Sequence, residues 1–146
     1  MKNEKESTKE KILAQAFAQL SASARDGVSL SDIARSVGIS KAAIFRHYAD
    51  KNTLLRSMGE RFFDDAAQGV RENLRGIRGR LKTRDVLTVF IRFLAAHTEY
   101  FGYIRRLCGQ ADKMEDVLAE EFGRRGIRFE KKTKKGGGGG GLWDGE

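Results

Sequence analysis

The sequence predicts an all-α protein, and three observations support this class. None of the 146 residues is proline, the residue that most strongly breaks helices. Apolar residues recur three and four positions apart along most of the chain, which is the spacing of one helix face. No stretch shows the apolar–polar alternation of a strand, and no internal repeat is visible.

Composition excludes several classes of protein. A single cysteine, Cys108, excludes an intramolecular disulfide framework and a cysteine-based zinc site. No apolar run approaches the roughly 18 residues of a membrane span, and no signal-peptide core follows the charged N-terminus. We therefore expect a cytoplasmic protein with no membrane partner. Its 28 basic residues against 20 acidic ones give a net charge of +8, which favours a polyanionic partner.

The first helix is expected near the N-terminus. Residues 7–10 read Ser-Thr-Lys-Glu, the pattern of a capping box that would begin a helix. An apolar stripe follows at helical spacing, and Asp26 with Gly27 would end the segment by turn chemistry. The stripe consists of Ile12, Leu13, Ala16, Phe17 and Leu20.

Two short helices and a long one should follow. A helix over residues 30–37 would stop at Gly38, which can adopt the left-handed conformation of a helix end. Ser40 can cap the next helix, which would run to about Tyr48, and Asp50 can cap the long helix. Glycines at positions 76 and 79 should break the long helix. Further helices are expected from Thr83 or Asp85, around 100–107 and around 114–122.

The last residues differ from the rest in composition. Residues 131–135 are rich in lysine, and residues 136–141 are all glycine. Each glycine costs about 1 kcal/mol relative to alanine in a helix, so residues 131–146 should form a disordered tail.

Residues 29–48 have the pattern of a helix-turn-helix. Ala34 would lie where two helices cross closely. If Ile44 and Tyr48 point inward, a step of about 100° per residue places Ala42 and Arg46 at the centre of the exposed face. Ala43 and Phe45 would flank this centre, with Lys41 and His47 at the sides.

The exposed face of this second helix suits DNA. Small alanines permit close approach to a major groove and can touch thymine methyl groups, while Arg46 can reach a guanine edge or a phosphate. Lys51 and the amides at the start of the next helix could hold a further phosphate. An ordinary solvated face of a small helical bundle is the alternative, and Phe45 could then be half-buried packing. That alternative leaves unexplained why the face combines alanines with basic residues and carries no acid.

These residues resemble the N-terminal DNA-binding domain of the TetR family of bacterial transcriptional regulators. The resemblance extends from residue 8 to about residue 62. The matching segments are residues 11–17, 28–34, 37–41 and 44–48, together with Lys51, Leu54 and Leu55.

The resemblance implies an all-α fold in which a three-helix helix-turn-helix domain at residues 1–55 precedes an incomplete helical effector and dimerisation domain at residues 56–130. It implies a sequence-specific regulator of double-stranded operator DNA, a repressor that a small-molecule effector releases. The implied DNA-binding residues are Ser29, Ser40, Lys41, Ala42, Ala43, Phe45, Arg46, His47 and Lys51. The family usually has tyrosine in place of Phe45, so one hydrogen bond to the DNA backbone would be missing.

The resemblance also raises a question about dimerisation. The family forms homodimers through two late helices, and we do not recognise these helices after residue 83. A run of six glycine codons can contain a slippage-prone tract of guanines. A truncated or frame-shifted regulator with impaired dimerisation is therefore an alternative to a functional homodimer.

Two other classes of function were compared with DNA binding. A basic membrane-surface or interaction module is possible because basic residues cluster between positions 71 and 84. An enzyme is not expected, because the adjacent acids Asp64 and Asp65 would point about 100° apart on a helix. His97 and Cys108 lack the partners of a metal or nucleophilic site, so no cofactor, metal or catalytic residue is expected.

Overall fold

The prediction of an all-α chain is confirmed by the computed structural model, which describes residues 4–22, 27–76, 81–110, 112 and 114–130. The described residues form seven α-helices, a short 3₁₀ helix and two strands of two residues each. The elements are α1 (Glu4–Ala22), α2 (Leu30–Val37), α3 (Lys41–His47), α4 (Lys51–Asn73), β1 (Leu81–Lys82), α5 (Thr83–Ala96), η1 (Thr98–Tyr100), α6 (Phe101–Gln110), α7 (Met114–Arg124) and β2 (Phe129–Glu130).

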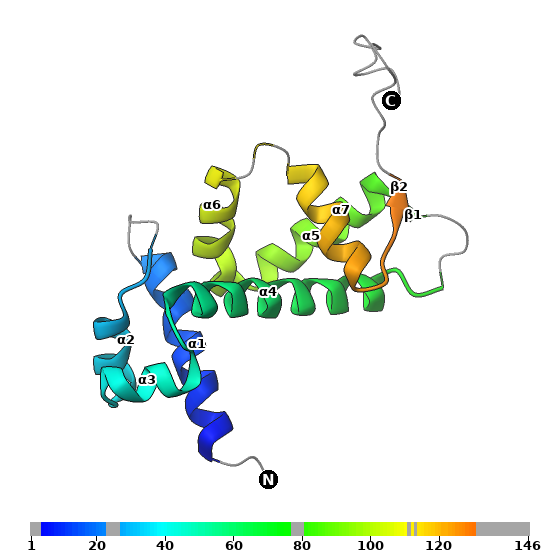
Figure 1. Cartoon of the computed structure of the whole chain (residues 1–146). Helices are drawn as coiled ribbons and strands as arrows, with labels where there is room; N and C mark the ends of the chain where they lie inside the picture. Colours follow the sequence, from blue (N-terminus) through cyan, green and yellow to red (C-terminus); the bar gives the residue numbers. More distant parts are fainter. Residues whose placement is uncertain (1–3, 23–26, 77–80, 111, 113, 131–146) are drawn as a thin grey trace.

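Helix α4 is the long axis on which the other elements are arranged. Helices α1, α2 and α3 gather near its first turns, and α5, α6 and α7 lie along the rest of it (Figure 1). The strand pair lies at the far end of α4 from α2 and α3 (Figure 1). Helix α4 passes through the expected division at residue 55, so the two expected domains share one helix.

The helix signals around the helix-turn-helix are confirmed. The Ser40 hydroxyl accepts a hydrogen bond from the Ala43 amide at 3.0 Å, and the Asp50 carboxylate accepts one from the Thr53 amide at 2.7 Å. Gly38 ends α2 with a φ of 87°, a conformation that favours glycine. These local contacts fix where α2 ends and where α3 and α4 begin.

Three details of the predicted elements are wrong. Helix α1 begins at Glu4, so Ser7 lies within the helix instead of capping it. Glutamate and lysine, which make up residues 4–6, favour helix. Helix α4 already ends at Asn73. The parallel pair of β1 and β2 was also missed, because two residues per strand are too few to show alternation.

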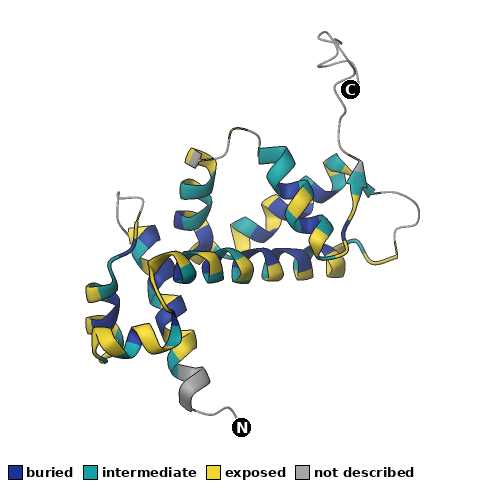
Figure 2. Ribbon diagram, in the orientation of Figure 1, coloured by how far each residue is buried: buried dark blue, intermediate teal, exposed yellow. Residues whose placement is uncertain are grey.

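The core joins the two ends of the molecule through α1 and α4 (Figure 2). On the helix-turn-helix side, Ile33, Ile44 and Tyr48 are buried against the predicted α1 stripe. Further along α4, the ring of Phe62 is fully buried among aromatic side chains. Its neighbours, with centroids 4.9 to 6.1 Å away, are Phe63, Phe90, Phe93, Tyr100 and Tyr103.

Some sequence expectations concern residues outside the described ranges. These are the turn residue Asp26, the helix breaker Gly79 and the glycine-rich tail at 131–146.

Candidate nucleic-acid interface

Helix α3 presents the face that the sequence predicts. Its inward residue Ile44 is fully buried, whereas Ala42 and Arg46 on the opposite side are exposed (Figure 2). Lys41 is exposed as well, and Ala43 and His47 are half-buried. The helix contains no acidic residue. This face therefore combines small and basic side chains on a short helix that is accessible from outside.

Phe45 is more accessible than an ordinary packing residue. Its side chain is 42% exposed, one of three large apolar side chains exposed in the described part of the chain. The alternative of half-buried packing is therefore not supported. A phenylalanine ring offers no hydrogen-bond donor for a phosphate but can contact apolar base edges.

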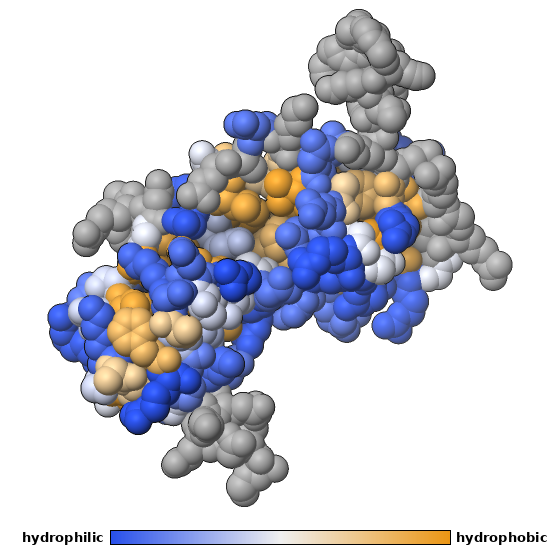
Figure 3. All heavy atoms as spheres, in the orientation of Figure 1, coloured by the Kyte–Doolittle hydropathy of each residue, from blue (hydrophilic) through white to orange (hydrophobic). Residues whose placement is uncertain are grey.

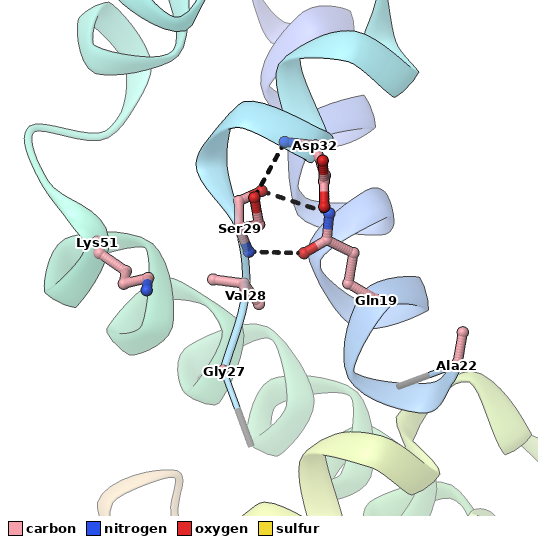
Figure 4. A pocket seen from close by; sticks show the side chains of 7 residues that line it. All are labelled: Gln19, Ala22, Gly27, Val28, Ser29, Asp32 and Lys51. Carbon is pink, nitrogen blue, oxygen red and sulfur yellow. Dashed lines mark hydrogen bonds between the residues drawn. The ribbon is translucent and has the colours of Figure 1, made fainter. Parts of the chain in front are cut away.

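Ser29 and Lys51 come together at one pocket next to α3. The pocket has a volume of about 300 Å³ and is lined by Gln19, Ala22, Gly27, Val28, Ser29, Asp32 and Lys51 (Figure 4). Lys51 projects from the first turn of α4, and Ser29 lies immediately before α2 with its hydroxyl turned toward the Asp32 amide (Figure 4). The structure thus brings together at one pocket two residues that are 22 positions apart and that the sequence analysis assigns to DNA binding.

Ser29 is held in place from both sides. Its hydroxyl accepts a hydrogen bond from the Asp32 amide at 3.1 Å, which leaves its own O–H able to donate to a phosphate. Its backbone N–H donates to Gln19 Oε1 at 2.8 Å, and its carbonyl accepts from Gln19 Nε2 at 3.3 Å (Figure 4). The nearby Asp32 carboxylate is paired with Arg35 at 2.9 Å, which reduces its repulsion of an anion.

Gln19 is the pocket residue that sequence reasoning missed. It follows Ile12 by seven positions and Ala16 by three, so it lies on the buried side of α1 although it is polar. A polar residue on an apolar helix stripe is the signal that could have identified it, because a buried polar group requires a hydrogen-bonding partner.

The end of α3 is anchored to α1 by Tyr48. The Tyr48 hydroxyl donates to the Lys9 carbonyl at 3.3 Å, and the Lys9 ammonium lies 5.4 Å from the centre of the Tyr48 ring. Burial, with a further contribution from the nearby Glu10 carboxylate, raises the pKa of Tyr48 to about 12. The hydroxyl therefore remains a donor at physiological pH.

The acids considered for catalysis have structural partners. Asp64 bonds Arg125 at 2.8 Å, and Asp65 accepts a hydrogen bond from the Tyr100 hydroxyl. His97 stacks on Phe93 with ring centres 4.2 Å apart. Among the described residues there is no cluster of three metal-ligating side chains, and none of their helices is long and apolar enough to cross a membrane.

The fold and the face of α3 define a helix-turn-helix DNA-binding domain. Residues 12–58 match the family model for bacterial regulatory proteins of the tetR family. This segment is a TetR-family helix-turn-helix domain, and the chain that carries it is a DNA-binding transcriptional regulator. No curated protein and no solved structure matches the chain.

Proposed function

We propose that the chain is a repressor that binds operator DNA through α3 and is released by a small-molecule effector. In this proposal α3 enters the major groove, where Arg46 contacts a base edge and Ala42 and Phe45 lie against apolar edges. Ser40, Lys41, Ala43 and His47 meet the groove and its walls. Ser29 and Lys51 hold the DNA backbone.

The pocket shared by Ser29 and Lys51 is the observation that best supports this proposal. It places a hydroxyl donor and an ammonium group beside the start of α2, where the helix dipole also favours an anion. A phosphate bound there would be held by the residue before α2 and by the first residue of α4, the helix that follows α3. Backbone contacts of this kind set the position of a recognition helix on DNA, and the base contacts then supply specificity.

Repression requires a second binding unit, and we propose a homodimer. One helix-turn-helix makes few contacts, and dimers of this class bind two half-sites about 34–36 Å apart. TetR-family regulators typically dimerise. An apolar area between α6 and α7 is visible on the surface in Figure 3, and Ile91 and Phe101 are 62% and 51% exposed. Apolar surface of this kind is compatible with a partner subunit.

The effector would bind away from the DNA. The aromatic side chains around Phe62 pack against one another, so they contribute to the core. A second pocket, of about 470 Å³, lies where the end of α4 meets β1 and the chain before β2. Val70 and Ile127 are buried in its floor, and the exposed Arg71 and Arg128 stand at its edge. This combination favours an effector with an apolar body and an anionic group.

The test of DNA binding is selection from random duplexes, followed by gel shifts of the selected sequence and a scrambled duplex. We expect the selected sequence to contain an inverted repeat and to bind at least a hundredfold more tightly than the scrambled one. Anionic vesicles serve as the competing partner. Vesicle binding without preference among DNA sequences would favour the membrane-surface alternative and contradict the proposal.

The test of release adds decanoate and, as the uncharged control, decanol to the protein–operator complex. Decanoate should lower operator affinity and raise the melting temperature of the free protein, and Arg128→Gln should weaken both effects. Equal effects of decanoate and decanol would exclude a role for the two arginines.

A further inference from the structure

The last turn of α1 is in unusually close contact with α6. A Cβ atom added to Gly102 would lie 2.3 Å from the carbonyl carbon of Leu20 and 2.4 Å from both the Leu20 oxygen and the Ser21 nitrogen. These are backbone atoms, which cannot move aside as a flexible side chain would. Glycine at position 102 therefore permits α6 to approach the main chain of α1 directly.

Polar contacts fix this approach. The Arg105 guanidinium donates to the Leu20 carbonyl at 2.6 Å, and the Gly102 amide donates to the Ser21 hydroxyl at 3.2 Å. Carbonyls in the last turn of a helix lack partners within the helix, and a cation is favourable there. The last turn of α1 contains no basic residue of its own. Arg105 supplies the missing charge from α6.

Gln19, the residue before Leu20, holds Ser29, which is a candidate for phosphate contact. Gln19 makes both hydrogen bonds to the backbone of Ser29 that are described above. The same turn of α1 therefore makes two contacts. Leu20 contacts α6, and Gln19 contacts Ser29. This turn also contributes Gln19 and Ala22 to the pocket of Ser29 and Lys51 (Figure 4).

We propose that Gln19 and Arg105 are positioning residues for DNA binding. Arg105 fixes the last turn of α1, and Gln19 transmits that position to the backbone of Ser29, so that Ser29 is held in the pocket it shares with Lys51 before DNA arrives. A contact that is ordered in advance does not lose conformational entropy on binding. This inference rests on the proposed function, because Ser29 and Lys51 must bind phosphate for their positioning to affect affinity.

The experiment measures operator affinity between about 50 and 200 mM salt for Gln19→Ala and Arg105→Gln. The matched control is Arg92→Gln, which removes an exposed arginine from α5. Each test variant should bind operator roughly tenfold more weakly. Because the phosphate would then also be lost from the Lys51 ammonium, its slope of log affinity against log salt should fall by up to about 0.9, the value for one phosphate neutralised by a cation. The control should match the wild type in affinity and slope, apart from a small nonspecific charge effect.

A double variant and hydrogen exchange separate positioning from loss of stability. The double variant Gln19→Ala with Arg105→Gln should be no weaker than the weaker single variant, because both changes release the same contact. The Ser29 amide should exchange faster in Arg105→Gln than in the wild type, even without DNA. Gly102→Ala should have the same effects where it folds.

Two results would overturn the inference. One is an Arg105→Gln variant with wild-type affinity, salt slope and Ser29 exchange. The other is weaker binding with an unchanged salt slope and a lowered melting temperature, which would indicate a purely structural role. Failure of the wild type to prefer any DNA sequence would instead refute the proposed function, while Ser29 exchange would still report whether Arg105 positions Ser29.

Discussion

The helices of the candidate DNA interface and the helices beyond it are stabilised in different ways. Helices α2, α3 and α4 each begin at a side chain that accepts a hydrogen bond from a backbone amide, and these side chains are Ser29, Ser40 and Asp50 in turn. Helix α5 begins after Lys82, whose side chain makes no such bond. The DNA-binding end thus depends strongly on contacts between residues three positions apart, whereas the other end depends on partners far away in the sequence.

The distant contacts at the other end are of two kinds. One is the set of aromatic rings around Phe62 on α4. The other is Arg125, whose side chain is 10% exposed and bonds Glu60 and Asp64 of α4 at 2.8 Å. Burial opposes the charge on Arg125, but its hydrogen bonds to carboxylates outweigh this and raise its pKa. A single substitution at either place should therefore affect several helices together.

The largest expected effect follows from removing the central ring of this region. Phe62→Ala should lower the free energy of unfolding by about 3–5 kcal/mol, because it removes a fully buried ring and leaves a cavity among its five aromatic neighbours. Urea denaturation gives the measurement. Phe45→Ala, measured without DNA, is the matched control, and its exposed ring should contribute less than about 0.5 kcal/mol. Similar losses for both variants would contradict the described core.

The next effect concerns DNA affinity and should leave folding unchanged. Arg46→Ala should weaken binding to the selected operator by about 1–3 kcal/mol and should reduce the preference over scrambled DNA. Lys51→Ala should weaken binding evenly on both duplexes, because a phosphate contact carries no sequence information. Gel shifts at a fixed salt concentration distinguish the two. An equal loss for Arg46→Ala on both duplexes would exclude its role in reading bases.

A smaller effect tests the local contacts of the DNA-binding end. Ser40→Ala should lower the free energy of unfolding by about 0.5–2 kcal/mol, because the Ala43 amide loses its acceptor at the start of α3. Ser36→Ala, at an exposed position within α2, should be neutral or slightly stabilising because alanine favours helix. If both variants lost the same stability, the cap would not be important for α3.

The difference between the two regions also explains what the sequence could predict. The ends of α2 and the starts of α3 and α4 were predictable because Gly38, Ser40 and Asp50 act within a few residues. The approach of α6 to α1 was not, because nothing adjacent to Gly102 in the sequence indicates Leu20 as its neighbour. The pairing of β1 with β2 was not predictable either, because each strand is too short to show alternation and its partner lies 48 positions away.

In the candidate site, too, features fixed by nearby residues were predictable and features fixed by distant residues were not. The exposed face of α3 followed from a 100° step, because the orientation of a short helix is fixed once Ile44 is buried. The pocket joining Ser29 to Lys51 depends on the arrangement of α1, α2 and α4 together. Sequence analysis could name those two residues but could not identify Gln19 as the side chain that holds one of them.

The smallest effect tests the link between α3 and α1, where a local helix end meets a distant partner. Tyr48→Phe removes the hydrogen bond to the Lys9 carbonyl and should cost about 0.5–1.5 kcal/mol at pH 7. Because the folded protein holds the pKa of Tyr48 near 12 and an unfolded tyrosine titrates near 10, this tyrosine favours folding fully only below about pH 10. As the pH rises toward 12, the unfolded state loses its proton first, and the wild type loses stability that the variant does not. Urea denaturation at pH 7 and pH 10.5 should therefore show the difference between the two proteins shrinking by roughly 1 kcal/mol. A difference that stays constant would mean that Tyr48 titrates as a tyrosine in water does, and that α3 is not anchored to α1 through a buried hydroxyl.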